Sequence, residues 1–85
     1  MTSNTLVSII IPAFNEQSSI KRALKSAMSQ SLREIEIIVV NDASTDKTSS
    51  IVKDLSTSEG RIKLVTHDTN KGLSHSRITG INAAT

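Results

Sequence analysis

Short apolar runs alternate along the chain with stretches in which apolar residues recur at helical spacing. The runs are rich in Ile, Leu and Val and have the length of β-strands. The stretches between them carry apolar residues three and four positions apart, which is typical of one buried helix face. The pattern predicts strands over residues 6–11, 35–40 and 62–66 and helices over residues 20–30, 48–55 and 73–84.

The residues that border these elements refine the prediction. Pro12 is expected to end the first strand, because it has no N–H for the ladder. Residues 15–18 (Asn-Glu-Gln-Ser) are expected to provide the N-cap of the first helix and an acid for its first turn. The third strand alternates between apolar and polar residues, which favours a position near the edge of the sheet.

The order β-α-β-α-β-α predicts the fold class. Strands that alternate with helices form a parallel sheet through right-handed crossovers, with helices on both faces. We therefore expect an α/β, three-layer, Rossmann-like half-domain over residues 1–85. Three parallel strands are half of a doubly wound domain, so we expect the domain to be incomplete.

Composition excludes several classes of protein. The chain is 36% hydrophobic and 21% charged, as globular chains are, and it has no cysteine for disulfides or thiolate metal sites. No apolar run is long enough to span a bilayer, and the N-terminus lacks the basic start of a signal peptide. The net charge of +2 is scattered and Phe14 is the single aromatic residue, so we expect no nucleic-acid partner.

Candidate chemistry lies in the turns that follow the three strands, at residues 12–17, 41–46 and 67–72, because ligands of open α/β sheets bind at the carboxyl ends of strands. Neither a G-x-G-x-x-G segment nor a P-loop is present. Phe14 is interpreted either as a platform for a planar ring or as a core anchor beneath the first helix. Asp42 is interpreted either as an acceptor for a ligand N–H or as a cap of the second helix. His67, Asp68 and His75 are interpreted as surface polar groups rather than metal ligands.

Three blocks of sequence resemble the family 2 glycosyltransferases. Residues 7–16 (VSIIIPAFNE) are similar to the family's V-S-I-I-I-P-A-Y-N-E, and residues 36–46 (EIIVVNDASTD) to its E-I-I-V-V-D-D-G-S-T-D. Residues 70–77 (NKGLSHSR) are similar to its N-x-G-x-x-x-A-R-N segment. The resemblance implies the N-terminal portion of a GT-A fold, which holds the nucleotide of a sugar donor, commonly a UDP-sugar.

The resemblance also implies roles for single residues. Asp42 would accept the imide hydrogen of the base, Glu16 would lie at the pocket rim, and Arg77 would lie near the base or the diphosphate. The residues implied to bind the nucleotide are Pro12, Ala13, Phe14, Glu16, Asp42 and Arg77. No catalytic residue and no metal ligand is implied within these 85 residues.

The chain departs from the family pattern in two ways that matter. Ala43 replaces the usual glycine, which affects the turn if it requires a positive φ. The D-x-D metal motif and the catalytic-base aspartate of the family do not occur here. We therefore expect a divalent metal, Mg or Mn, only in the full-length enzyme, and no sugar transfer by this chain alone.

The functional prediction is the donor-nucleotide-binding half of an inverting glycosyltransferase of polysaccharide biosynthesis. The whole enzyme would transfer a sugar from a nucleotide-sugar, a UDP-sugar in particular, to a hydroxyl of a glycan or lipid-linked acceptor. It would work in the cytoplasm, at the inner face of the membrane. The alternative is a non-catalytic α/β interaction or scaffold module. The apolar strand at residues 6–11 is expected to form an exposed edge through which two copies associate.

Overall fold

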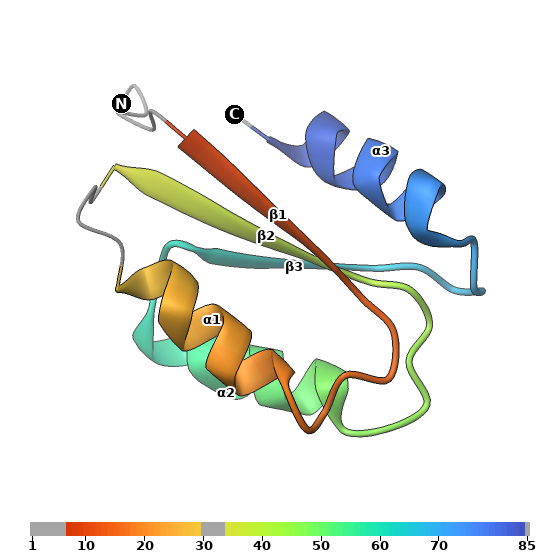
Figure 1. Cartoon of the computed structure of the whole chain (residues 1–85), viewed down its shortest axis with the longest axis horizontal. Coiled ribbons are helices and arrows are strands. Elements are labelled where there is room, and N and C mark those ends of the chain that lie inside the picture. Colours follow the sequence, from red (N-terminus) through yellow and green to blue (C-terminus); the bar gives the residue numbers. More distant parts are fainter. Residues whose placement is uncertain (1–6, 30–33, 85) are drawn as a thin grey trace.

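The computed structural model describes residues 7–29 and 34–84. Its elements follow one another as predicted, and Figure 1 shows their arrangement. In chain order they are β1 (Val7–Ala13), α1 (Ile20–Met28), β2 (Ile35–Asn41), α2 (Thr48–Ser58), β3 (Ile62–Thr66) and α3 (Leu73–Ala83). Leu6, at the start of the first predicted strand, and Gln30, at the end of the first predicted helix, lie outside the described residues.

The three strands form one parallel sheet in the order β1-β2-β3. β2 lies in the centre, with Val7 opposite Ile35 on one side and Ile62 opposite Ile37 on the other. All seven residues of β2 are buried, as a strand covered on both faces requires. The predicted edge position of the third strand is confirmed within the described residues.

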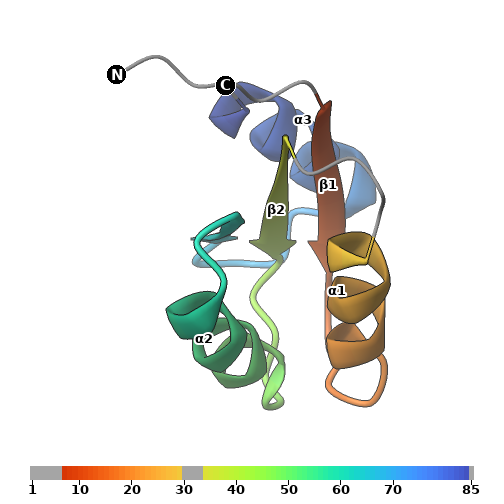
Figure 2. The same ribbon diagram turned by 90° about the vertical axis from the view of Figure 1, so that its left-hand side faces the viewer.

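The sheet lies between two helical layers. α1 and α2 cover one face and α3 covers the other, as the two perpendicular views show (Figures 1 and 2). The main core lies on the α1–α2 face, where alternate residues of β2 meet the apolar stripes of both helices. Its buried residues are Ala13, Ile20, Leu24, Ala27, Ile35, Ile37, Val39, Val52 and Ile62.

α3 approaches the opposite face of the sheet closely. Its buried residues are small, Ser76 and Gly80, one turn apart on the same side of the helix. A Cβ at position 80 would lie 2.4 Å from Cγ2 of Ile10 on β1. Glycine is therefore what allows α3 to rest on β1 at this distance.

The prediction that Pro12 ends the first strand is wrong, because β1 continues to Ala13. The carbonyl of Ala13 accepts a hydrogen bond from the Asp42 N–H, so the backbone of Ala13 is directed toward β2. The neighbouring Pro12 is directed to the open side of β1, where a strand loses no ladder hydrogen bond through the missing N–H.

The predicted capping of the first helix is wrong. α1 begins at Ile20, with Ser19 as its N-cap, and no side chain caps it and no acid lies in its first turn. Residues 15–18 precede the helix instead. Asn15, Glu16 and Gln17 bond to the loop after β2 and to the start of α2.

The outer side of β1 pairs with no other strand among the described residues. Val7 there is 44% exposed, whereas Ile9, Ile10 and Ile11 are half-buried. Association of two copies through this edge stays a prediction. Among residues 7–29 and 34–84, no helix has the length and the apolar character that crossing a bilayer demands.

Candidate functional site

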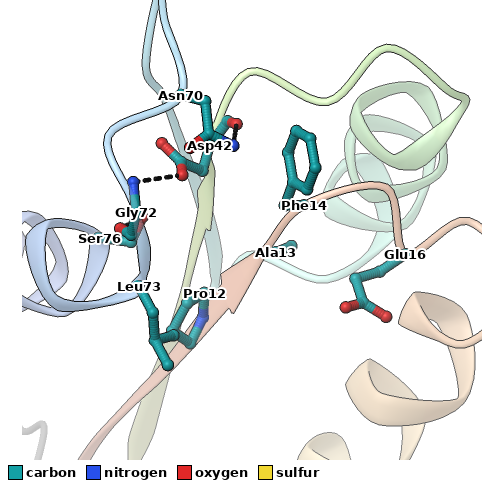
Figure 3. Close-up of a pocket in the computed structure, with 9 residues that line it drawn as sticks. All are labelled: Pro12, Ala13, Phe14, Glu16, Asp42, Asn70, Gly72, Leu73 and Ser76. Carbon is teal, nitrogen blue, oxygen red and sulfur yellow. Dashed lines mark hydrogen bonds between the residues drawn. The ribbon is translucent and has the colours of Figure 1, made fainter.

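The loops that follow the three strands meet at the carboxyl edge of the sheet and enclose a pocket of about 300 Å³. This volume is at the lower end of the range for small-molecule sites. Figure 3 shows the lining side chains on β1, on the loops and on the first turns of α3. They are Pro12, Ala13, Phe14, Glu16, Asp42, Asn70, Gly72, Leu73 and Ser76.

Phe14 forms one wall of this pocket. Its side chain is 46% exposed, so the interpretation as a core anchor beneath α1 is wrong. In Figure 3 the ring stands above the end of β1, on the same side as Asp42. An aromatic ring held at a pocket wall offers a flat apolar surface on which a planar ligand group can stack.

Asp42 organises the part of the pocket next to α3. Its Oδ1 accepts hydrogen bonds from the Lys71 N–H (2.8 Å) and His67 Nδ1 (2.8 Å), and its Oδ2 accepts from the Gly72 N–H (2.9 Å). The carboxylate thus holds the loop that leads into α3. The interpretation as a cap of the second helix is wrong, because Asp46 bonds to the Thr48 N–H at the start of α2 (2.9 Å).

These donors fix the charge of Asp42. The hydrogen bond from His67, followed by that from the Lys71 N–H, holds the pKa of the Asp42 carboxyl below its ordinary value; burial opposes this effect but does not outweigh it. Asp42 is therefore ionised at neutral pH and accepts hydrogen bonds without donating any. Residues 7–29 and 34–84 use three of its roughly four acceptor positions and leave one on Oδ2.

His67 is not the surface residue that we had expected. It follows β3 directly, its N–H donates to the Asn41 carbonyl (2.9 Å), and its side chain is 7% exposed. Both ring nitrogens have partners, Asp42 at Nδ1 and Thr79 Oγ1 at Nε2 (2.8 Å each). Among the described residues, no three His, Asp or Glu side chains are grouped to hold a metal ion.

The β1–α1 and β2–α2 loops are joined through Asn15. Its side-chain oxygen accepts from the N–H groups of Thr45 (2.8 Å) and Asp46 (3.3 Å), and its own N–H donates to Ser44 Oγ (2.9 Å). Asn15 has a φ of 53°, a left-handed conformation that asparagine tolerates better than most residues. The loop that carries Phe14 is thereby fixed to the neighbouring loop.

A second set of bonds continues this junction toward α2. The Glu16 N–H donates to Thr48 Oγ1 (2.8 Å), and the Gln17 N–H donates to Asp46 Oδ2 (3.2 Å). In return, the Lys47 N–H donates to Gln17 Oε1 (2.9 Å). Burial raises the pKa of Asp46, but the bonds from Thr48 and Gln17 outweigh it and the net pKa is lowered.

Ala43 adopts the conformation for which the family pattern has glycine. Its φ is 62°, so the turn after β2 does require a left-handed residue. A left-handed alanine is unfavourable by about 1–2 kcal/mol. Hydrogen bonds of its two neighbours hold the turn: the Asp42 N–H donates to the Ala13 carbonyl, and Ser44 Oγ accepts from the Asn15 N–H.

Five of the six residues expected to bind a ligand line one pocket, and Arg77 does not. Glu16 lies apart from the others, beside the start of α1 (Figure 3), and its Oε2 accepts from Ser19 Oγ (2.9 Å). Arg77 is exposed on α3 and is absent from the lining residues.

The prediction omitted four residues that also line the pocket: Asn70, Gly72, Leu73 and Ser76. It also omitted His67, which bonds to Asp42. The signal for them was their position in the third turn and at the start of the helix after it.

Comparison with known proteins gives a family match over almost the whole chain. The model of "Glycosyl transferase family 2" matches residues 8–85. A mannosyltransferase of Pyrobaculum calidifontis, PcManGT, solved in complex with GDP-Man and Mn²⁺, superimposes with a TM-score of 0.86 at 30% identity. TarS 1-349 of S. aureus, solved in complex with UDP-GlcNAc, superimposes with a TM-score of 0.84, also at 30% identity. Each match covers 93% of this chain, and 24% of PcManGT or 23% of TarS.

One curated relative is named by the reaction that it catalyses. It is the GalNAc(5)-diNAcBac-PP-undecaprenol beta-1,3-glucosyltransferase of Campylobacter jejuni, 42% identical over 57 residues, which are 67% of this chain and 18% of the relative. Across the first curated relatives that it matches, the chain spans between 11% and 32% of their length.

Proposed function

Because the chain belongs to glycosyl transferase family 2, we propose that residues 1–85 are the donor-nucleotide-binding portion of an inverting glycosyltransferase that uses a UDP-sugar. The fold class expected from the sequence, the N-terminal part of a GT-A fold, is confirmed by the superposition on PcManGT and TarS. The choice of nucleotide, the inversion and the binding residues are the proposal.

The observation that carries the proposal is an ionised carboxylate at a pocket wall with an aromatic ring nearby. Asp42 can only accept hydrogen bonds, and none of the described residues uses the second acceptor position of its Oδ2. Uracil presents an imide N–H, whereas the corresponding ring nitrogens of cytosine and adenine are acceptors that would face the carboxylate unfavourably. Phe14 supplies the face on which a base ring can stack.

Guanine is the competing base, because its ring N–H also donates to a carboxylate. TarS is solved with a UDP-sugar and PcManGT with a GDP-sugar, so relatives with similar structures divide between these two bases. The pocket of about 300 Å³ favours the smaller pyrimidine. We therefore expect the affinity to be highest for UDP, lower for GDP, and lowest for CDP and ADP.

In the whole enzyme, the sugar would pass from the diphosphate to a hydroxyl of a glycan or lipid-linked acceptor. The Campylobacter relative, whose name contains an undecaprenol-linked glycan, supports this choice of acceptor. We place the transfer at the cytoplasmic face of a membrane. A divalent metal, Mg or Mn, would neutralise the diphosphate, and the Mn²⁺ in PcManGT supports it. We propose that these 85 residues neither bind that metal nor transfer sugar by themselves.

The test is an NMR titration of the ¹⁵N-labelled chain with UDP, GDP, CDP and ADP. We expect UDP to shift the amide signals of residues 13–16 and 70–73 and to bind roughly ten-fold more tightly than CDP. UDP and CDP differ mainly at the hydrogen-bonding edge of the base, so CDP is the matched control. Equal binding of UDP and CDP would contradict the role of Asp42.

A titration without shifts for any nucleotide would favour the alternative, a non-catalytic interaction or scaffold module. Tighter binding of GDP than of UDP would support the nucleotide-binding function but identify guanine, not uracil, as the base of the donor.

A further inference from the structure

We propose that His67 is a positioning residue of the nucleotide pocket, which holds the Asp42 carboxylate in the orientation that receives the base. The inference rests on the function proposed above. It assigns a role to a residue outside the pocket lining, which acts on the nucleotide only through Asp42.

His67 is held from three directions. Its backbone N–H donates to the Asn41 carbonyl at the end of β2 (2.9 Å), and its Nε2 lies 2.8 Å from Thr79 Oγ1 on α3. The ring of His75 packs against it edge to face, with centroids 5.7 Å apart and planes at 74°. The imidazole is thus fixed in position before it meets Asp42, and its own orientation is set by β2 and by α3.

The bond to Asp42 fixes the position of one proton on the ring of His67. Asp42 is ionised, so Nδ1 of His67 must carry the proton that bridges the 2.8 Å to Oδ1. Nε2 is satisfied by the Thr79 hydroxyl, which can donate to that nitrogen or accept from it. Each polar atom of the chain Thr79–His67–Asp42 is satisfied with the negative charge on Asp42. The groups that face His67 and can carry charge are Asp42 and His75.

The other donors to Asp42 do not replace this contact. Lys71 and Gly72 donate through backbone N–H groups of the loop that leads into α3, so they move with that loop. Among the described residues, His67 is the side chain that bonds to the Asp42 carboxylate. It ties the carboxylate to the sheet, whereas the loop donors tie it to α3, whose residues Leu73 and Ser76 form a pocket wall.

A pair of amide substitutions separates positioning from packing. His67→Asn places an amide nitrogen near the position of Nδ1 and can keep the bond to Asp42. His67→Gln places its amide near Nε2 and can keep the contact with Thr79 but not the bond to Asp42. Both variants remove the ring and bring in the same polar group, so each controls for the other.

Two quantities are measured on the 85-residue chain and its variants. The first is the affinity for UDP by NMR titration, and the second is the pKa of the Asp42 carboxyl, followed through its ¹³C shift. We expect His67→Asn to retain UDP affinity within about two-fold and to keep the Asp42 pKa low. We expect His67→Gln to weaken UDP binding roughly ten-fold and to move the Asp42 pKa up toward its ordinary value.

The outcomes are distinguishable. If both variants behave alike in affinity and in the Asp42 pKa, His67 is a packing residue and the inference fails, even though the unsubstituted chain binds UDP. If the unsubstituted chain binds no nucleotide but the two variants differ in the Asp42 pKa, the proposed function fails while the positioning of Asp42 by His67 stands.

A milder substitution covers the case in which His67→Gln does not fold. Thr79→Val removes the hydroxyl that orients the ring while it keeps the side-chain shape. We expect a loss of UDP affinity of about three-fold. Unchanged UDP affinity and an unchanged Asp42 pKa in a folded Thr79→Val chain would overturn the inference.

Discussion

A buried carboxylate lies near each end of β2, and the two carboxylates differ in their hydrogen-bond partners. Glu36, near the amino end, accepts from Lys63 Nζ (2.8 Å) and from the Ser8 hydroxyl, which are side chains of the neighbouring strands. Asp42, after the carboxyl end, accepts from backbone N–H groups of a loop and from His67. Both residues are 3% exposed, so burial alone does not distinguish them.

The difference in partners indicates a difference in role. The bonds of Glu36 to Ser8 and Lys63 link three strands that the ladder already holds together, and Glu36 is not among the residues that line the pocket beside Asp42. The bonds of Asp42 shape a loop with no ladder of its own, and that loop forms a pocket wall. We infer that Asp42, held by backbone donors at the carboxyl edge of the sheet, belongs to a ligand-binding site. Glu36, held between strands, contributes to the stability of the fold.

The sharpest way to break this comparison is to remove each carboxylate in turn. We expect Asp42→Ala to lower UDP affinity roughly ten-fold or more, because the acceptor for the base and the organiser of the loop are lost together. We expect Glu36→Gln to lower the free energy of unfolding by about 1–3 kcal/mol and to leave UDP affinity unchanged. Thermal unfolding and UDP titration of both variants give the two quantities.

Two results of this experiment would contradict the comparison. One is a loss of UDP affinity in Glu36→Gln. The other is an Asp42→Ala chain that unfolds at a lower temperature but binds UDP as before.

The second prediction tests the wall that α3 provides. Gly80→Ala would force a methyl group to within 2.4 Å of Ile10 Cγ2, and overpacking of this kind costs about 1–3 kcal/mol. Alanine in a helix recovers about 1 kcal/mol, so we expect a net loss of up to about 2 kcal/mol. Gly60→Ala is the control, because a Cβ there meets no atom within 4 Å. Urea unfolding measures the free energy of unfolding of both variants. If Gly80→Ala is as stable as Gly60→Ala, α3 does not rest on β1 as described.

The third prediction concerns the turn after β2. Ala43→Gly should raise the free energy of unfolding by about 0.5–1 kcal/mol, because the relief of a left-handed alanine exceeds the entropy that glycine adds to the unfolded chain. Asn15→Gly is the control at the other left-handed residue. It should be destabilising, because the side-chain bonds of Asn15 to the neighbouring loop are lost. Chemical unfolding of both variants checks the opposite signs.

The smallest expected effect concerns the outer edge of β1. We expect the 85-residue chain to associate at high concentration and Val7→Lys to reduce this association, because a charge on an edge strand opposes pairing with another strand. Ser74→Lys, on the exposed side of α3, is the control for added charge. Light scattering over a range of concentrations measures the effect, and association that is equal in all three chains would exclude the β1 edge.

The sequence predicted the elements well because local patterns determine them. Alternation of apolar runs with helical spacing was enough for the order of elements, for the parallel sheet and for β3 at its edge. Pro12 was misjudged because its effect depends on which side of the strand its nitrogen faces. That side follows from the pairing with β2, which the sequence of the strand does not contain.

The site was predicted in its location but not in its internal bonds. The position of Phe14 and Asp42 after strands was enough to place both at one pocket. The partners of Asp42 are 25 to 30 residues away in the sequence, so local rules could not decide between its two interpretations, a ligand acceptor and a cap of the second helix. Asn15 was likewise expected to cap its own helix and instead bonds to a loop 30 residues further on.

The measurement that tests the central claim most directly is the ratio of UDP to CDP affinity in the unsubstituted chain and in Asp42→Asn. An ionised carboxylate accepts from uracil and repels the acceptor nitrogen of cytosine, whereas an amide of the same shape can also donate to cytosine. We predict a preference for UDP of roughly ten-fold in the unsubstituted chain and a preference reduced toward unity in Asp42→Asn. A UDP preference that is the same in both chains would show that Asp42 does not read the base.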